Sequence, residues 1–543
     1  MKSLGKFVIH TLKSHLFFSK RLIFEAVWNI YLMSKLLNRT VKTYLAYCHR
    51  MLKNSIESPF EAQEKVFQKL ITNFKNTKYG KKHDIRHVKN QVDYRRAYPV
   101  VNYEDLKPFI ERMMKGESDV LIGGSVRFFS KSSGTTSDKS KFIPVTRTNL
   151  YKNHIKSAWD SLSLFYQKKP DAQLFHRKSL LISGSLTHLP DYPKAIIGDI
   201  SAIMTKNMPS IGRSFYTPDI ETAMLSDWDE KIKRITEQVG TQDVAMFGGV
   251  PTWLLVTFRE LLKKYNKKNL LEIWPNLEGY LHGGVGFGPY IDQFKELVPS
   301  KDFIYQEIYN ASEGFFGIQQ YNEDDSMLLL VNNSVFYEFL PISQWEVSSP
   351  IAIGLKDVQI GQPYALLITS NNGLSRYLVG DVIEFTSVRP FKFKIKGRTQ
   401  QYINIFGEEV MVDNTDKAIS MTCTTFNASI ENYSVGPVFL TTSSKGGHEW
   451  IIEFNRLPND IDAFTALLDK NLRQLNSDYD AKRSYDIALL RLKITIVPKG
   501  TFHRWLQLKN KLGGQNKIPR LANHRNYIDD LLECADFVVK TSR

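Results

Sequence analysis

Cysteine is scarce in this chain. Its 543 residues include three cysteines, Cys48, Cys423 and Cys534, which lie far apart and form no CxxC pair. An odd number of separated cysteines supports neither a disulfide framework nor a cysteine-based metal site, and it is typical of a reducing compartment. We therefore expect a cytoplasmic protein without structural disulfides.

A hydrophobic run long enough for a membrane span is also missing. The stretch Leu22–Ser34 is mostly apolar, but it is shorter than the roughly 20 residues of a transmembrane helix and contains Glu25. Residues 1–54 hold ten lysines and arginines against Glu25 alone. Apolar residues recur there at helical spacing, at Leu4, Val8, Leu12 and Leu16. We predict that residues 1–30 form a basic amphipathic leader that packs on the body or contacts an anionic membrane surface peripherally. No alanine-rich cleavage site follows, so a secretory signal is not expected.

Signatures of nucleic-acid binding are absent too. The formal net charge is +16, but more than half of this excess lies in residues 1–54. The remaining chain shows no basic-aromatic repeat, zinc-finger spacing or helix-turn-helix pattern. No nucleic-acid partner is expected, and the charge is better explained by small anionic ligands together with the leader.

The chain has enough apolar residues for more than one folded domain. It is 42% hydrophobic and 24% charged, which is typical of globular proteins. Helices and strands are predicted to alternate through residue 303, as at Val244–Phe247, the helix that begins at Pro251, and Leu277–Leu281. Further helices are predicted over Glu61–Asn76, Tyr103–Met114 and Asn149–Phe165. Gly284, Gly286 and Gly288 do not match GxGxxG, because the third glycine comes too early. The pattern indicates an α/β body with a largely parallel sheet.

The pattern changes twice towards the C-terminus. Successive strands are predicted from Met327 to Lys396, with a tight hairpin at Asn372-Gly373 and separate strands at Arg376–Leu378 and Val382–Phe385. Mixed helices and strands follow. The predicted fold class is therefore α/β, with a large N-terminal domain over residues 31–396 that includes an antiparallel β region, and a small mobile α+β domain over residues 397–543.

A loop rich in hydroxyl groups lies between two short predicted strands, Val126–Phe129 and Phe142–Val145. Serine, threonine and lysine surround a single glycine, Gly134. Backbone N–H groups, hydroxyls and ammonium groups are the donors that a polyphosphate needs. The loop is not a GxxxxGK[ST] motif, and it joins two strands instead of opening a helix. Its composition alone fits a phosphate-binding loop and an ordinary polar hairpin equally well.

Four further segments combine with this loop. They are Tyr309…Ser312-Glu313, Tyr377…Val379-Gly380-Asp381, Lys396-Gly397-Arg398 and Gln515…Lys517…Pro519-Arg520. Taken singly, each has a structural explanation as a core, turn or surface segment. In this order, together with Ser132-Ser133-Gly134-Thr135 and Lys141, the segments resemble adenylate-forming enzymes. Within that group they look most like the auxin-responsive promoter family of acyl-acid amido synthetases, and specifically its bacterial branch. The resemblance covers roughly residues 30–540.

The resemblance implies a two-step, AMP-producing ligase that uses ATP and Mg²⁺. A carboxylic acid is first adenylated, and an amine, that of an amino acid in plant relatives, then takes the acyl group. It implies that Ser132, Ser133, Gly134, Thr135 and Lys141 hold the β- and γ-phosphates, that Tyr309 stacks on adenine, that Ser312 bonds near the α-phosphate, that Glu313 holds Mg²⁺, that Asp381 binds the ribose hydroxyls, that Arg398 reinforces the nucleotide edge and that Lys517 is catalytic. Because Lys517 lies in the small domain, that domain is expected to close as a lid by rotation near Gly397–Gln400.

This chain departs from the family pattern at several positions. Ser137-Asp138-Lys139 stands where plant relatives have Ala-Gly-Glu, and Asn310-Ala311 replaces Gly-Ser. Two alternatives remain open at this stage. The acceptor is a thiol, coenzyme A or a carrier protein, or the chain is a non-catalytic relative that binds nucleotide or membrane. The sequence does not identify the acid or the amine.

Overall fold

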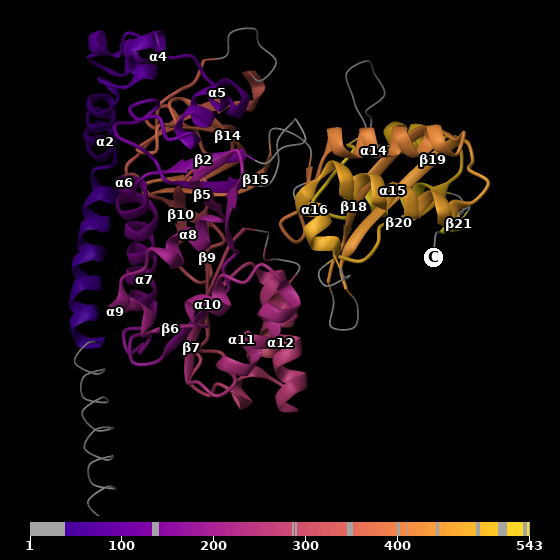
Figure 1. The fold of residues 1–543 in the computed structure, drawn as a ribbon, viewed down its shortest axis with the longest axis horizontal. Helices are drawn as coiled ribbons and strands as arrows, with labels where there is room; N and C mark the ends of the chain where they lie inside the picture. The colour runs from indigo at the N-terminus through magenta and orange to yellow at the C-terminus, as the bar shows by residue number, and fades with distance from the viewer. Residues whose placement is uncertain are drawn as a thin grey trace, which may run out of the picture.

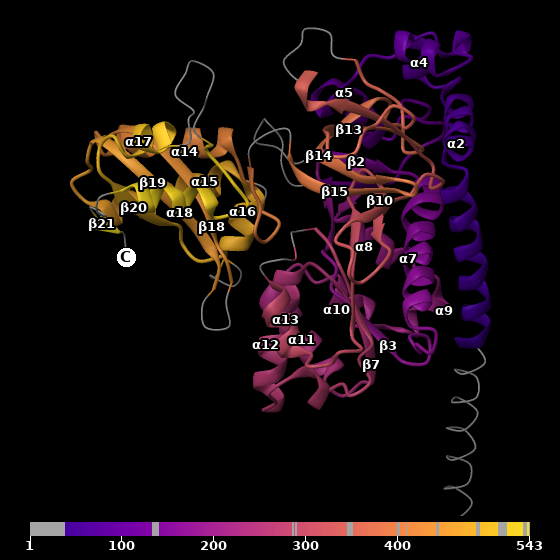
Figure 2. The same cartoon turned by 180° about the vertical axis from the view of Figure 1, so that it is seen from behind.

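The structure is a computed structural model that describes residues 38–132, 141–284, 287, 290–344, 351–398, 402–408, 410–440, 445–484, 489–508, 519–535 and 540–541. The leader predicted over residues 1–30 lies outside these ranges. A large body and a smaller lobe, coloured orange to yellow, lie side by side (Figures 1 and 2). In the part of the chain that the structure describes, every helix is too short or too polar to reach across a bilayer.

Two helices in succession line one side of the body. A helix over residues 38–57 is followed by α2 (Pro59–Phe74), whose first position is a proline that needs no N–H partner there. In both views they run beside α7 (Ile155–Lys168). Four short elements follow: α3 (Lys78–Lys82), η1 (Ile85–His87), α4 (Gln91–Ala97) and α5 (Tyr103–Met114). The helices predicted near Glu61–Asn76 and at Tyr103–Met114 are confirmed.

One mixed sheet forms the centre of the body. In the described residues it has eleven strands in the order β12-β13-β14-β15-β11-β10-β9-β8-β7-β3-β6. Strands β6, β3, β7, β8 and β9 pair in parallel, and all pairs from β9 to β12 are antiparallel. The parallel half comprises β3 (Lys178–Leu181), β6 (Tyr216–Thr217), β7 (Val244–Gly249), β8 (Gly279–His282) and β9 (Ile304–Asn310). The antiparallel half comprises β10 (Phe315–Gln319), β11 (Met327–Leu329), β12 (Val335–Pro341), β13 (Pro363–Ser370), β14 (Tyr377–Val388) and β15 (Phe391–Arg398).

Helices connect the strands of the parallel half, as the alternating sequence pattern predicts. They are α8 (Ile200–Lys206), α9 (Ser210–Arg213), α10 (Ile220–Ala223), α11 (Trp228–Val239), α12 (Pro251–Tyr265), η3 (Leu270–Glu272) and α13 (Ile291–Leu297), and η5 (Ile342–Gln344) follows β12. The helix predicted over Asn149–Phe165 is divided in the structure. Its first part is α6 (Arg147–Asn149) and a π-helical turn, η2 (Leu150–His154), and α7 continues it.

A second, four-stranded sheet frames the hydroxyl-rich loop. Its order is β2-β1-β5-β4, with β1 (Phe128–Ser132) antiparallel to β2 (Lys141–Val145) and parallel to β5 (Tyr192–Gly198), and β4 (Leu186–Leu189) at the edge. The loop thus joins two strands, as predicted.

The smaller lobe has its own sheet, in the order β18-β19-β20-β21, and its own helices. Its elements are β16 (Tyr402–Ile403), β17 (Val410–Met411), α14 (Val412–Thr425), β18 (Ser429–Val438), β19 (Gly447–Arg456), α15 (Ile461–Leu475), α16 (Ser477–Arg483), β20 (Lys493–Val497), α17 (Thr501–Leu508), α18 (Asn526–Cys534) and β21 (Lys540–Thr541). Residue 397, the predicted domain boundary, lies near the end of β15.

Candidate active site

The first side of the candidate site is the β1–β2 hairpin. Lys141 on β2 lies directly opposite Ser132 on β1 and is half-buried, so it stands where the loop rejoins the sheet. The Phe142 N–H donates to the Tyr103 hydroxyl at 2.9 Å, which braces the hairpin against α5. Ser133, Gly134 and Thr135 lie outside the described residues.

A buried serine pair joins this hairpin to the central sheet. The Ser130 hydroxyl, fully buried on β1, donates to the Ser312 hydroxyl at 2.9 Å. Ser312 belongs to the turn Ala311–Gly314 that connects β9 to β10. The two segments that the sequence places far apart are therefore in direct contact.

The β9–β10 turn is closed by reciprocal hydrogen bonds between Ala311 and Gly314, at 2.9 and 3.2 Å. Two asparagine side chains hold it from outside. The Asn372 amide donates to the Glu313 carbonyl at 3.2 Å, and the Asn153 amide accepts from the Phe315 N–H at 2.8 Å. These contacts fix the turn's backbone around the buried carboxylate side chain of Glu313.

Tyr309 and Asp381 form the next part of the site. The Tyr309 hydroxyl donates to the Asp381 carboxylate, and both side chains are buried. The Tyr309 ring meets Phe316 edge to face, with centroids 5.1 Å apart. A carboxylate offers about four acceptor positions, so the Tyr309 bond is one of several that Asp381 can accept.

Gly380, which precedes Asp381 on β14, has an unusual backbone conformation. Its φ is +100°, and apart from its chain neighbours no described residue has an atom within 4 Å of a Cβ built there. Glycine is therefore needed for the backbone conformation rather than for tight packing. Arg398 on β15 lies directly opposite Asp381 in the strand register.

A buried histidine borders the same turn, and the sequence did not single it out. The ring of His154, at the end of the π-helical turn, is fully buried, and its Nδ1 lies 2.9 Å from the Asn310 Oδ1. Burial lowers the pKa of His154 to about 4, so the imidazole is neutral at pH 7. Among the described residues its Nε2 has no hydrogen-bond partner. Helical periodicity could assign His154 to the buried face, but it carries no sign of the π turn.

The smaller lobe touches the body close to this site. The Lys131 ammonium lies 3.9 Å from the Asp478 carboxylate, and the Lys482 ammonium lies over the Trp253 ring at 4.8 Å. Lys517 lies outside the described residues. Two residues later the chain is anchored on β18, where the Pro519 carbonyl accepts from the Ser434 hydroxyl at 2.7 Å.

Comparison with solved structures defines the class of protein. The fold matches "AtGH3.15 acyl acid amido synthetase in complex with 2,4-DB" with a TM-score of 0.59 at 18% identity, covering 92% of this chain and 97% of that one. It also matches a 2-hydroxyisobutyryl-CoA ligase bound to 2-HIB-AMP and CoA, with a TM-score of 0.53 at 13% identity over 88% and 92% of the two chains. The chain thus has the fold of the adenylate-forming ligases.

Sequence comparison defines the family within that class. Models of the GH3 family N-terminal, central and C-terminal domains match residues 48–303, 328–398 and 413–526, and the chain belongs to this family. Similar proteins include an indole-3-acetic acid-amido synthetase, GH3.4, of Arabidopsis thaliana (23% identical, covering 87% of this chain and 91% of the relative). A 4-substituted benzoates-glutamate ligase, GH3.12, of the same plant is 21% identical over 89% of this chain and 96% of its own length. A jasmonoyl-L-amino acid synthetase, JAR4, of Nicotiana attenuata is 23% identical, covering 86% of this chain and 91% of the relative.

Proposed function

We propose that this chain is an ATP-dependent acyl-acid amido synthetase, which joins a carboxylic acid to an amine, that of an amino acid, through an acyl-adenylate. The observation that carries the proposal is the Ser130–Ser312 hydrogen bond, because it joins the strand entering the hydroxyl-rich loop to the turn bearing Glu313. The amido synthetase names of the GH3 relatives support amide formation as the second step.

In the first step, an oxygen of the acid attacks the α-phosphorus of ATP, the bond to the β-phosphate breaks, and pyrophosphate leaves. Backbone and hydroxyl donors of the loop would hold the departing phosphates, and Lys141 would add positive charge where the loop ends. The other parts of the nucleotide are assigned to single residues. Tyr309 would stack on adenine, Ser312 would bond near the α-phosphate, Asp381 would bind the ribose and Arg398 would reinforce the nucleotide edge. The phosphate loop comprises Ser132, Ser133, Gly134 and Thr135.

Glu313 would hold Mg²⁺. The described residues contain no cluster of three or more histidine, cysteine or acidic side chains able to enclose a metal. A single carboxylate is sufficient for Mg²⁺, which commonly takes one or two carboxylates together with substrate phosphates. When bound, Mg²⁺ neutralises charge on the phosphate oxygens. Glu313 is buried and its backbone carbonyl is held by Asn372, so its main chain is positioned before the substrate arrives.

In the second step, the amine nitrogen attacks the acyl carbon, the carbon–oxygen bond to AMP breaks, and the amine loses its proton to solvent. We assign Lys517 to the first step, in which it would offset negative charge at the α-phosphate. The domain division at residue 397 would let the smaller lobe bring Lys517 in and then turn away. The contact between Asp478 of the smaller lobe and Lys131 of the body would have to break in that movement.

ATP–pyrophosphate exchange with a panel of carboxylic acids tests the first step without knowledge of the amine. We expect Lys517→Ala to slow exchange by about 100-fold, since loss of one transition-state donor commonly has an effect of this size. Lys499→Ala, which removes an exposed lysine of the same lobe, is the control. If Lys517→Ala exchanges pyrophosphate at the normal rate, the assignment of Lys517 to the first step is wrong.

The acceptor is tested on the acid that exchange identifies. Amino acids should accelerate AMP release and yield an amide, whereas coenzyme A should not. The opposite preference would contradict the amide assignment and identify a thioester-forming ligase with the same first step.

A further inference from the structure

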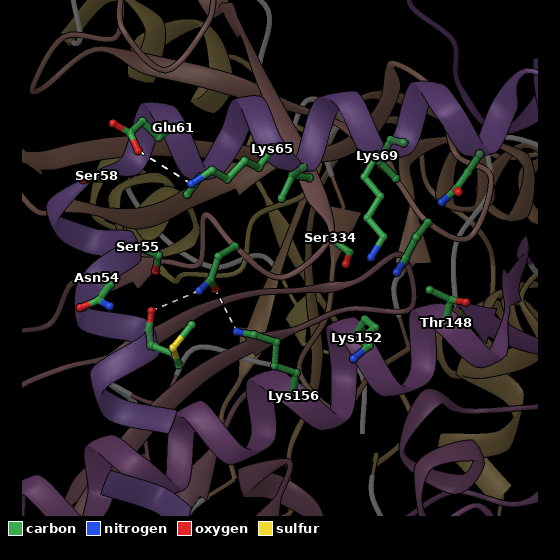
Figure 3. A pocket seen from close by; sticks show the side chains of 17 residues that line it. Asn54, Ser55, Ser58, Glu61, Lys65, Lys69, Thr148, Lys152, Lys156 and Ser334 are labelled. Atoms are coloured by element: carbon green, nitrogen blue, oxygen red, sulfur yellow. Dashed lines mark hydrogen bonds and ion pairs between the residues drawn. The ribbon is translucent and has the colours of Figure 1, made fainter. Parts of the chain in front are cut away.

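A pocket lies between α2 and the η2–α7 helix, and no step of the proposed reaction uses it. The pocket has a volume of about 620 Å³, within the range of small-molecule sites. The helix over residues 38–57 and α2 form one wall, and η2 with α7 forms the facing wall (Figure 3). Residues from the loops after β11 and β13 complete the lining, among them Asn332, Ser334 and Asn371.

The pocket is strongly basic. Four of its lining residues are lysines, and its only acidic lining residue is Glu61. Lys65 and Lys69 stand four residues apart on α2, and Lys152 and Lys156 stand four apart on the facing helix. Residues at this spacing share a helix face, so each helix contributes a pair of lysines to the lining of the same pocket.

Two of these lysines are already paired, and two are not. Lys65 lies 3.8 Å from Glu61, and Lys156 lies 2.7 Å from the Asp160 carboxylate. Lys69 and Lys152 make no hydrogen bond or ion pair with any described residue. In Figure 3 the Lys69 side chain extends from α2 into the hollow, whereas Lys65 turns along the helix to Glu61. Two solvent-exposed lysines, Lys69 and Lys152, thus bring unpaired positive charge to the lining of the pocket.

The lining also contains a buried donor without a partner. Asn371 is 2% exposed, its backbone carbonyl accepts from the Thr146 hydroxyl at 3.1 Å, and its Oδ1 accepts from the Asn149 amide at 3.2 Å. Among the described residues, nothing accepts a hydrogen bond from its Nδ2. A buried amide donor left unmatched is unfavourable, so this position calls for an acceptor atom.

We propose that this pocket binds a small phosphorylated compound, whose phosphate group is held by Lys69, Lys152 and the Asn371 amide. A dianionic phosphate suits two unpaired ammonium groups and one N–H donor better than a single carboxylate does. The volume leaves room for the rest of a metabolite-sized molecule.

The pocket shares no lining residue with the candidate active site but adjoins a residue that supports it. Asn371 lines the pocket, and the next residue, Asn372, donates to the Glu313 carbonyl. A ligand that moves Asn371 would therefore act on the turn that holds Glu313. By thermodynamic reciprocity, ATP would then change the affinity for phosphate by the same factor.

Titration calorimetry with inorganic phosphate at constant ionic strength tests the site. We expect saturable binding that weakens at least tenfold in Lys69→Gln/Lys152→Gln, because each substitution removes a charge-assisted hydrogen bond. The double variant Lys75→Gln/Lys89→Gln, which removes the same charge from exposed positions nearby, should bind like the unaltered protein. Asn371→Asp, which replaces the donor by a carboxylate of the same shape, should also weaken binding.

Lys141→Gln shows whether inorganic phosphate binds at the catalytic loop instead. If phosphate binding is lost in Lys141→Gln and kept in Lys69→Gln/Lys152→Gln, the proposal is overturned. Competition against a soluble sugar phosphate and against vesicles containing an anionic phospholipid separates the two sources of the phosphate group, and failure of both to displace inorganic phosphate would also overturn it. Because no turnover is measured, the result is independent of the amido synthetase assignment.

Discussion

Removal of the Asn153 side chain tests whether the β9–β10 turn is held as the structure describes. Its amide accepts from the Phe315 N–H at 2.8 Å and donates to the carbonyls of Phe315 and Asn333, at 3.2 and 3.0 Å. In Asn153→Ala the Phe315 carbonyl keeps a second donor, the Asn333 amide. The Phe315 N–H and the Asn333 carbonyl lose the partner described for them.

The expected cost follows from these two groups. A buried donor or acceptor left unsatisfied costs roughly 1–3 kcal/mol, so Asn153→Ala should destabilise the large body by about 4 kcal/mol. The turn also carries Ser312 and Glu313. Loosening it should slow ATP–pyrophosphate exchange by about 10- to 100-fold, since a misplacement of about 1 Å has effects of this order.

Thermal unfolding and exchange on the same preparations provide the assay. The control is Asn471→Ala, which deletes a buried asparagine of the smaller lobe that donates to the Thr422 hydroxyl at 3.0 Å. It should lower stability and leave exchange unchanged at temperatures where the protein is folded. If Asn153→Ala exchanges at the normal rate while unfolding earlier, the turn does not depend on Asn153 for its catalytic geometry.

Two further predictions concern the same neighbourhood. The pKa of His154 is lowered in the folded protein from 6.5 to about 4. The neutral histidine therefore contributes to stability above pH 6.5, and this contribution is lost as the pH falls towards 4. The free energy of unfolding should fall by about 3 kcal/mol in all. Thermal unfolding between pH 7 and pH 4.5 should thus depend less on pH in His154→Asn than in the unaltered protein, and equal dependence would show that the histidine is not buried as a neutral group. In Gly314→Ala the new Cβ would lie 2.7 Å from the Cε1 of the fully buried Phe316, which should cost about 1–3 kcal/mol and reduce exchange. Gly123→Ala, whose Cβ would meet nothing nearer than 3.9 Å, is the matched control, and equal thermal midpoints of the two variants would contradict the packing described at Gly314.

Local sequence signals predicted single elements well. The bounds of α5 agree with the prediction because Asn102 and Asp105 form a capping box that can be read from the sequence. The antiparallel strands after Met327 were also predicted, but Arg376–Leu378 and Val382–Phe385 are one strand, β14. Gly380 lies between the two predicted segments, and the structure accommodates its positive φ inside the strand.

The arrangement of these elements could not be predicted in the same way. That the parallel and antiparallel regions form one sheet depends on the pairing of β9 with β8 and β10, which no local pattern encodes. Candidate residues such as Glu313 and Asp381 were found through their types and order. Their supports were not, because Asn153 and Asn372 resemble ordinary helix and turn residues, and their role exists only once distant segments meet.

The position of β9 explains why this site needs such supports. In a doubly wound sheet, a strand at the catalytic edge is followed by a helix whose N-terminus can hold phosphate. Here β9 pairs in parallel with β8 but turns back at once into antiparallel β10, so no helix follows Ser312 and Glu313. The β9–β10 turn itself therefore offers no helix N-terminus to the nucleotide. The phosphate donors must come from elsewhere, from the hydroxyl-rich loop that Ser130 joins to the turn. Asparagine side chains in turn fix the turn's backbone. The composition of the loop and the polarity of the buried residues around the turn are two consequences of the same strand order.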